Sequence, residues 1–284
     1  TISPRLWSHV RESGCPLSSI LWVSVTNADD GILPPRPVDN LKNRFSLDHK
    51  LVCASIVSWL LGLIFGRWDI RYFTGERLPS VLPDPFSPLP VCPPAMLQNA
   101  QGFPAEPKDI SSDYPLRISW SGIIIDEEDH PESIVSRVRE SIEVIWKTYA
   151  ETIEQKVCES LGVTTLHNYF RRPANFFDYH LKSYSRSHRQ APLYWPLSTP
   201  SGSYTIWLYY HRLTDQILYT CVNDYVEPKL KQVSDEAASL RGKSNRPSIE
   251  EIELERLIVL EQELKDFRNE LLRIARFWKP NLND

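Results

Sequence analysis

The C-terminal stretch "SIEEIELERLIVLEQELKDFRNELLRIARFWK", residues 248–279, has a regular apolar spacing that predicts a long helix. Ser248, with Glu251 three residues later, is the pattern of a helix N-terminal capping box. Apolar residues then recur at intervals of three and four, which is typical of a helix that packs along a partner helix. These residues are Leu257, Leu260, Leu264, Phe267, Leu271, Ile274 and Trp278.

The preceding segment, 214–240, carries a second apolar stripe that can pair with this seam. Its residues are Tyr219, Val222, Val226, Leu230, Val233, Ala237 and Leu240. Pro228 interrupts the stripe, so we expect a kink or a restart of the helix there. Because the polar loop "RGKSNRPS" separates the two stripes, the sequence predicts an antiparallel helical hairpin over 214–278.

An aromatic-rich hairpin, "APLYWPLSTPSGSYTIWLYYHRL" (191–213), comes before these helices, with Pro-Ser-Gly at its turn. Alternation sends apolar or aromatic side chains to both faces of its second strand. We therefore expect both faces to be covered and most of its aromatic rings to belong to the core.

The N-terminal half is more irregular. Residues 1–45 are expected to be the tail of an upstream domain or a linker. Next comes a buried helix capped by Asp48, apolar over 51–65 and stopped by Gly66; this run is too short to span a bilayer, which needs about 20 residues. A Pro-rich belt (79–107) follows, in which we expect the following residues to be buried: Val81, Leu82, Phe86, Leu89, Val91, Met96 and Leu97.

Beyond the belt the sequence predicts a strand over 116–125 and one long helix that starts at the acidic run "DEEDHPE" and ends near residue 161. The apolar face of this helix is expected to consist of Val138, Ile142, Ile145, Tyr149, Ile153 and Val157. The predicted fold is α+β and mostly helical, with a buried helix, a Pro-rich belt, a small β-hairpin or sheet and a C-terminal helical hairpin. Its expected divisions are 1–45, 46–125 and 126–284.

Composition restricts the class of protein. The 284 residues carry a net charge of −4 and are 42% hydrophobic, which are values of a globular chain that is not basic overall. The five cysteines are scattered and odd in number, which favours reduced thiols and a cytoplasmic location. The first and last residues suggest a piece of a longer polypeptide.

No motif supplies a catalytic centre or a metal site. "ASLRGKS" (238–244) lacks the first glycine of a phosphate-binding loop, because position 237 is Ala. "VCPPAM" (91–96) resembles an amino-methyltransferase loop, but Cys92 and Ala95 offer neither an acceptor for the amine nor a ring to stack on a base. We therefore expect no catalytic residue and no metal ligand in this chain.

The strongest functional signal is a basic segment, 164–192, which holds five Arg or Lys residues against one acid, Asp178. Arginine and lysine neutralise phosphates, and interleaved aromatics can stack on bases. The alternative is a solvated helix whose aromatics face the core. The expected phosphate contacts are Arg171, Arg172, Lys182, Arg186 and Arg189, with Tyr184 and His188 as weaker candidates for base or sugar contacts.

Five strings in order resemble one family: "FGRWDIRYFTGE" (65–76), "LPDPFSPLPVCPPAML" (82–97), residues 191–213 quoted above, "NDYVEPKL" (223–230) and "FWKPNLND" (277–284). Together they resemble the C-terminal region of large adenine-specific DNA methyltransferases of bacterial phage-exclusion (BREX-type) systems. The resemblance covers about residues 60–284.

The resemblance implies that S-adenosylmethionine and the N-P-P-Y/F loop belong to an N-terminal domain outside this sequence. No cofactor is expected in the fragment, which should be inactive alone. It would be the target-recognition and scaffold part of an N6-adenine DNA methyltransferase of restriction-modification or phage defence, with double-stranded DNA as partner. The alternative is a helical module that docks other subunits of a defence complex through 214–278. An unpaired apolar seam would favour that alternative, and a seam closed within the chain would weaken it.

Overall fold

The computed structural model describes residues 49–77, 91–92, 95–172, 174–186, 189–190, 192–243 and 247–280. They form two compact units. Unit 1 comprises the described residues up to 120 together with 135–179, and unit 2 comprises 121–134 and 180–280. The predicted fold class is confirmed, since helices dominate and the strands form two small antiparallel sheets.

The N-terminal helix of unit 1, α3 (His49–Ile64), is the predicted buried helix, and Gly66 at a φ of +69° follows its end. Ile56, Leu60 and Ile64 are buried in it. The cap assigned to Asp48 lies outside the described residues. The other helical segments that lie wholly or partly in unit 1 are α4 (Arg71–Thr74), η2 (Pro107–Asp109), α5 (Ile134–Trp146), η3 (Lys147–Tyr149), α6 (Ala150–Leu161), α7 (Leu166–Arg171) and α8 (Phe176–Ser183).

The single helix expected up to residue 161 is wrong, because the chain turns between α5 and α6. Lys147 adopts a φ of +50° in this turn, and Tyr149 is exposed instead of facing the core. Arg139 of α5 binds Glu154 of α6 with an Nη2–Oε1 distance of 2.8 Å. In a continuous helix, residues this far apart would be separated by roughly 20 Å. The ion pair therefore requires the break.

The acidic run is also not the start of a helix, since α5 begins only at Ile134. Residues 126–133 form a loop of unit 2, and the Nζ of Lys229 donates to Oε1 of Glu127 at 2.6 Å. The side chain of Asp126 in this loop is buried. The carboxylates of this loop thus contribute to tertiary contacts rather than only to a helix terminus.

The strand expected over 116–125 is shorter, because β1 comprises only Ile123–Ile125. Gly122, which precedes it, has a φ of +72°, and a Cβ atom built there would lie 2.4 Å from the Cβ of Arg212. Only glycine fits this close approach at a positive φ.

The Pro-rich belt is described only over 91–92 and 95–107. Leu97 is buried as expected, Met96 is half-buried, and Val91 is 72% exposed, so the expectation for Val91 is wrong. The expectations for Val81, Leu82, Phe86 and Leu89, like those for residues 1–45, lie outside the described residues.

The main sheet of unit 2 has the order β1-β5-β4, formed by β1, β5 (Thr205–Tyr209) and β4 (Tyr194–Ser198). Both pairings are antiparallel, and Trp207 of the central strand lies opposite Ile124 on one side and Pro196 on the other. Every residue of β5 is buried, which confirms that both faces are covered. Pro196 cannot donate to a ladder, and it lies in the edge strand.

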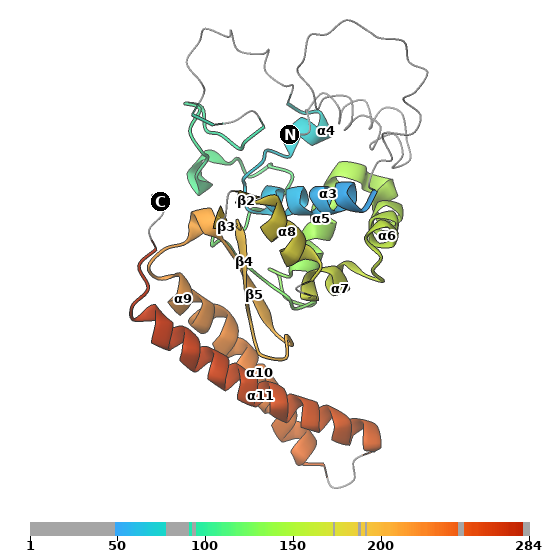
Figure 1. Cartoon of the computed structure of the whole chain (residues 1–284), viewed down its shortest axis with the longest axis vertical. Helices are drawn as coiled ribbons and strands as arrows, with labels where there is room; N and C mark the ends of the chain where they lie inside the picture. The colour runs from blue at the N-terminus through green and yellow to red at the C-terminus, as the bar shows by residue number, and fades with distance from the viewer. Residues whose placement is uncertain are drawn as a thin grey trace, which may run out of the picture. The chain divides into compact units, whose positions relative to one another are not determined.

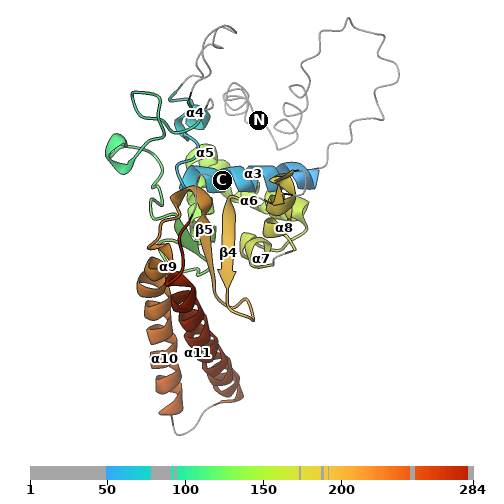
Figure 2. The same cartoon turned by 60° about the vertical axis from the view of Figure 1, so that its left-hand side comes forward.

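Four helical segments complete the C-terminal part: α9 (Ile217–Thr220), the π-helix η5 (Cys221–Val226), α10 (Glu227–Arg241) and α11 (Ser248–Ala275), with the short η4 (Tyr210–Arg212) before them. The predicted hairpin is confirmed: α10 and α11 lie side by side in both views (Figures 1 and 2). Pro228 cannot donate to the carbonyl four residues before it, and the wider π-helix ends where α10 starts.

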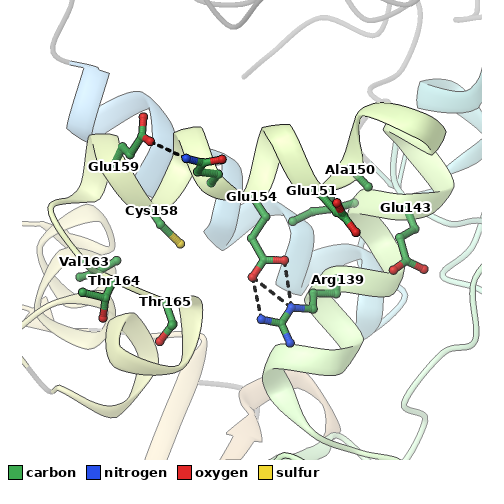
Figure 3. Close-up of a pocket in the computed structure, with 12 residues that line it drawn as sticks. Arg139, Glu143, Ala150, Glu151, Glu154, Cys158, Glu159, Val163, Thr164 and Thr165 are labelled. Carbon is green, nitrogen blue, oxygen red and sulfur yellow. Dashed lines mark hydrogen bonds and ion pairs between the residues drawn. The ribbon is translucent and has the colours of Figure 1, made fainter.

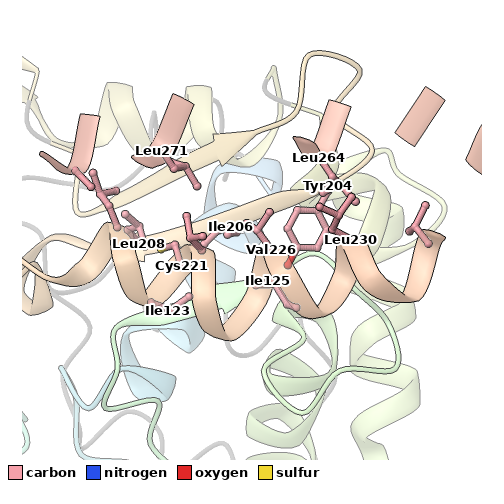
Figure 4. Close-up of a cluster of buried hydrophobic side chains, with 14 of the residues drawn as sticks. Ile123, Ile125, Tyr204, Ile206, Leu208, Cys221, Val226, Leu230, Leu264 and Leu271 are labelled. Carbon is pink, nitrogen blue, oxygen red and sulfur yellow. The ribbon is translucent and has the colours of Figure 1, made fainter. Parts of the chain in front are cut away.

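The seam of α11 is buried at Leu257, Leu264 and Leu271, as expected. The next expected residue, Ile274, is 38% exposed, and Ala275 is buried in its place. One face of the sheet packs on this hairpin through Ile123, Ile206 and Leu208, in a single cluster with Cys221, Val226, Leu230, Leu264 and Leu271 (Figure 4).

Leu264→Ala is expected to lower the free energy of unfolding by about 2–5 kcal/mol, because it leaves a cavity at a fully buried position. Ile252→Ala, at a site 66% exposed on the same helix, is the matched control and should change it by less than about 0.5 kcal/mol. Urea unfolding measures both. Equal effects would show that the seam is not closed.

Candidate nucleic-acid interface

The basic segment begins with two short helices, α7 and α8, whose aromatic rings are largely core. The Oγ1 of Thr165 caps α7 by accepting the N–H of Asn168 at 3.2 Å. Tyr169, Phe170 and Phe176 are buried, and the rings of Phe170 and Phe176 meet edge to face with centroids 5.1 Å apart. For these rings the structural interpretation therefore holds, and they are not available to bases.

The expected phosphate contacts are divided between the units. Arg171, half-buried at the end of α7, and the exposed Arg172 belong to unit 1. Lys182 is exposed in the last turn of α8, and Tyr184 follows it half-buried, both in unit 2. His188 lies outside the described residues. The expected contacts from Lys182 onward thus lie along one short stretch of unit 2, whereas Arg171 and Arg172 belong to unit 1.

The backbone after α8 forms a second sheet of two strands, β2 (Ser185–Arg186) and β3 (Arg189–Gln190). In its antiparallel register, Arg186 is the partner of Arg189. Neither strand contains an acidic residue. The β2–β3 ladder thus brings the backbones of two basic residues to opposite positions.

His180 anchors the start of this stretch to the main sheet. Its side chain is fully buried, and its Nε2 accepts the backbone N–H groups of Leu193 at 2.8 Å and Tyr194 at 3.2 Å. A ring nitrogen that accepts two such bonds carries no proton, so the imidazole is neutral. The rings of Tyr184 and Tyr194 lie against it, with centroids 4.7 and 4.8 Å away. His180, which lies within the basic segment 164–192, is thus a structural residue, and Tyr184 packs on it.

A pocket of about 650 Å³ in unit 1 is a second candidate site that sequence reasoning missed (Figure 3). Its lining includes the carboxylates of Glu143, Glu151, Glu154 and Glu159. The guanidinium of Arg139 also lines it and is bound to both oxygens of Glu154. Because carboxylates outnumber cations here, the pocket repels a phosphate backbone.

The thiols are not poised for catalysis. The four described cysteines, Cys53, Cys92, Cys158 and Cys221, are free and buried. Burial raises the pKa of Cys158 to about 11 and that of Cys221 to about 12, so both stay protonated and poorly nucleophilic at neutral pH. Within the described ranges, no group of three or more His, Cys, Asp and Glu side chains is placed to hold a metal ion. In that same part of the chain, no helix is both long and apolar enough to cross a membrane.

The sequence was also compared with protein-family models and with curated proteins, and neither comparison found a match.

His180→Phe should lower the free energy of unfolding, because it leaves the N–H groups of Leu193 and Tyr194 buried without their acceptor. Each unpaired group costs about 1–3 kcal/mol. The exposed His49 supplies the control, since His49→Phe removes no buried acceptor. Chemical unfolding measures both variants, and a stable His180→Phe protein would contradict the anchoring role.

Proposed function

We propose that this chain supplies a DNA-contacting part of an N6-adenine-specific DNA methyltransferase, and that it holds the duplex while a catalytic domain flips and methylates the target adenine. Lys182, Arg186 and Arg189 of unit 2 contact backbone phosphates. Arg171 and Arg172 are proposed as separate contacts made by unit 1. Methyl transfer itself is assigned to residues outside this sequence.

The observation that carries the proposal is the β2–β3 ladder, which sets two arginines opposite each other without a carboxylate in either strand. It lies in the segment where five basic residues face one acid, although the whole chain carries a charge of −4. Concentrated positive charge on a chain that is otherwise acidic is the electrostatic pattern of a localised nucleic-acid contact.

The resemblance implies that the whole enzyme uses S-adenosylmethionine. We assign no residue of this chain to that cofactor or to the methyl transfer. In the string closest to the N-P-P-Y/F loop, Cys92 is a buried thiol and Ala95 carries only a methyl group. Neither side chain can accept a hydrogen bond from the target amine in the way an amide oxygen would, and neither can stack on a base. No step of the transfer is therefore assigned to this chain.

A second candidate function is the docking of other subunits of a defence complex through 214–278. Its main support is weakened, because α10 closes the seam of α11 within the chain. One observation still favours it: Ile249, Ile252 and Val259 project from the first half of α11 and are exposed. This outer face, not the seam, would have to carry such docking.

Replacing Arg186 and Arg189 together with Ala in the intact methyltransferase should weaken duplex binding about equally for all sequences. The slope of log affinity against log salt should flatten by about one unit per lost phosphate contact, and thus by about two. Fluorescence anisotropy over a salt series measures both effects.

The matched control removes two other exposed cations of unit 2, Arg241 and Lys243, which lie at the end of α10. This double variant should retain the salt slope of the unaltered enzyme. Unchanged DNA affinity in the Arg186 and Arg189 variant would remove the ladder from the interface and leave subunit docking as the leading function.

A further inference from the structure

Unit 1 contains a compact ionic cluster within the string 65–76 and the residue that follows it. Its centre is Asp69, whose carboxylate is fully buried between two arginines. Arg71 donates from Nε to Oδ1 at 3.0 Å and from Nη2 to Oδ2 at 2.9 Å. Arg77 donates from Nη1 to Oδ2 at 3.0 Å. The carboxylate also accepts the backbone N–H of Arg71 at 3.0 Å.

Aromatic rings fix both guanidinium groups from the side. The Cζ of Arg71 lies 5.4 Å from the ring centroid of Tyr114, and that of Arg77 lies 5.1 Å from the ring centroid of Tyr72. The Tyr114 hydroxyl accepts the N–H of Ile70 at 3.1 Å and lies 3.4 Å from Oδ1 of Asp69. Burial raises the pKa of Tyr114, so the phenol stays protonated and donates toward the carboxylate. The two arginines are therefore held in place before any ligand arrives.

A purely structural role for Asp69 would require less than this. One bidentate arginine, the backbone N–H and the phenol are enough to compensate a single buried carboxylate. The second arginine leaves the trio of Asp69, Arg71 and Arg77 with a net charge of +1. Both arginine side chains also reach solvent, with exposures of 35% and 40%. Within the described residues, the hydrogen bonds of the two side chains come from Nε and Nη2 of Arg71 and from Nη1 of Arg77.

Guanidinium groups that are held by a carboxylate and remain partly exposed can bind phosphate oxygens through their other N–H groups. We propose that Arg71 and Arg77, held by Asp69, form a binding site for a phosphoryl group. This site lies in unit 1 and does not depend on the proposed contacts at Arg186 and Arg189. Its ligand is either a free phosphate ester or the phosphate of a nucleic-acid backbone, since both present the same oxygens.

Two carboxylates near the arginines oppose an anion. Glu76, which is exposed, and Asp113, which is hydrogen-bonded to the Ser111 hydroxyl, both act on Arg71 through their charge. Removal of one of them should therefore strengthen binding. Variants of the arginines and of these carboxylates should therefore change phosphate affinity in opposite directions. A loss of folding stability alone would not raise the affinity.

The test is titration of the full chain with inorganic phosphate at low ionic strength, followed through the arginine Nε–H signals in NMR spectra. Arg77→Gln keeps the bidentate Arg71–Asp69 pair, and thermal unfolding confirms that the variant is folded. It should weaken phosphate binding about tenfold, the loss of one charge-assisted bond. Glu76→Gln should strengthen binding roughly two- to fivefold.

Arg139→Gln is the matched control, because Arg139 is another ion-paired arginine of unit 1, and it should leave phosphate affinity unchanged. A parallel titration with duplex DNA identifies the source of the phosphate. If Arg77→Gln weakens both ligands, the site binds the nucleic-acid backbone; if it weakens only phosphate, the ligand is a free ester. No saturable phosphate binding by the unaltered chain, or equal affinity in Arg77→Gln, would overturn the proposal and leave the cluster as a structural ion pair. Loss of DNA binding in the Arg186 and Arg189 variant, with phosphate binding retained, would separate this site from the proposed function.

Discussion

Unit 2 depends on the burial of one apolar surface, where the sheet and the helical hairpin share a core. Ile206 and Leu208 of the central strand pack in the same cluster as Val226 of the π-helix and Leu264 of α11. Burial of such side chains contributes about 1.5–3 kcal/mol each, which is more than the exposed ion pairs of α11 can supply. Polar contacts then hold the ends of the helical region together. For example, Nε1 of Trp278, after α11, donates to the carbonyl of Thr214, before α9, at 2.9 Å.

The same core decides what the chain can present to a partner. Because β5 is buried along its whole length, the rings of Trp207 and Tyr209 belong to the core, whereas Trp195 of β4 is 41% exposed. His180 then fixes the end of α8 against Leu193 and Tyr194 at the start of β4. The backbone that follows α8 is thereby attached to the core immediately before the β2–β3 ladder. A charged segment held in this way suits contacts that position a phosphate backbone without reading bases.

Periodicity predicted the parts of the fold that repeat regularly. The seam through Leu257, Leu264 and Leu271 and the opposing stripe through Val226, Leu230 and Val233 could both be read from spacing alone, because helix packing imposes it. The break at Lys147 and the late start of β1 at Ile123 could not, because they depend on tertiary contacts: an ion pair between α5 and α6, and the approach of Arg212 to Gly122. For the region of the π-helix, the sequence predicted only a kink or a restart of the helix at Pro228.

For the candidate sites, the sequence showed which residues are charged but not which of them lie together in the fold. Local charge singled out Arg186 and Arg189, but their opposition in a ladder depends on the register. Asp69 and Arg77 are eight residues apart and occupy no common helix face, so their contact through a buried carboxylate could not be predicted from spacing.

The proposed function requires that DNA contact the basic stretch after α8 and not the helical hairpin. Hydrogen–deuterium exchange of the chain, with and without duplex DNA at low salt, tests it most directly. We expect slower amide exchange over residues 182–190 in the presence of DNA and unchanged exchange along α11. Slower exchange confined to the exposed half of α11, or no change over 182–190 at a DNA concentration that saturates binding, would contradict it.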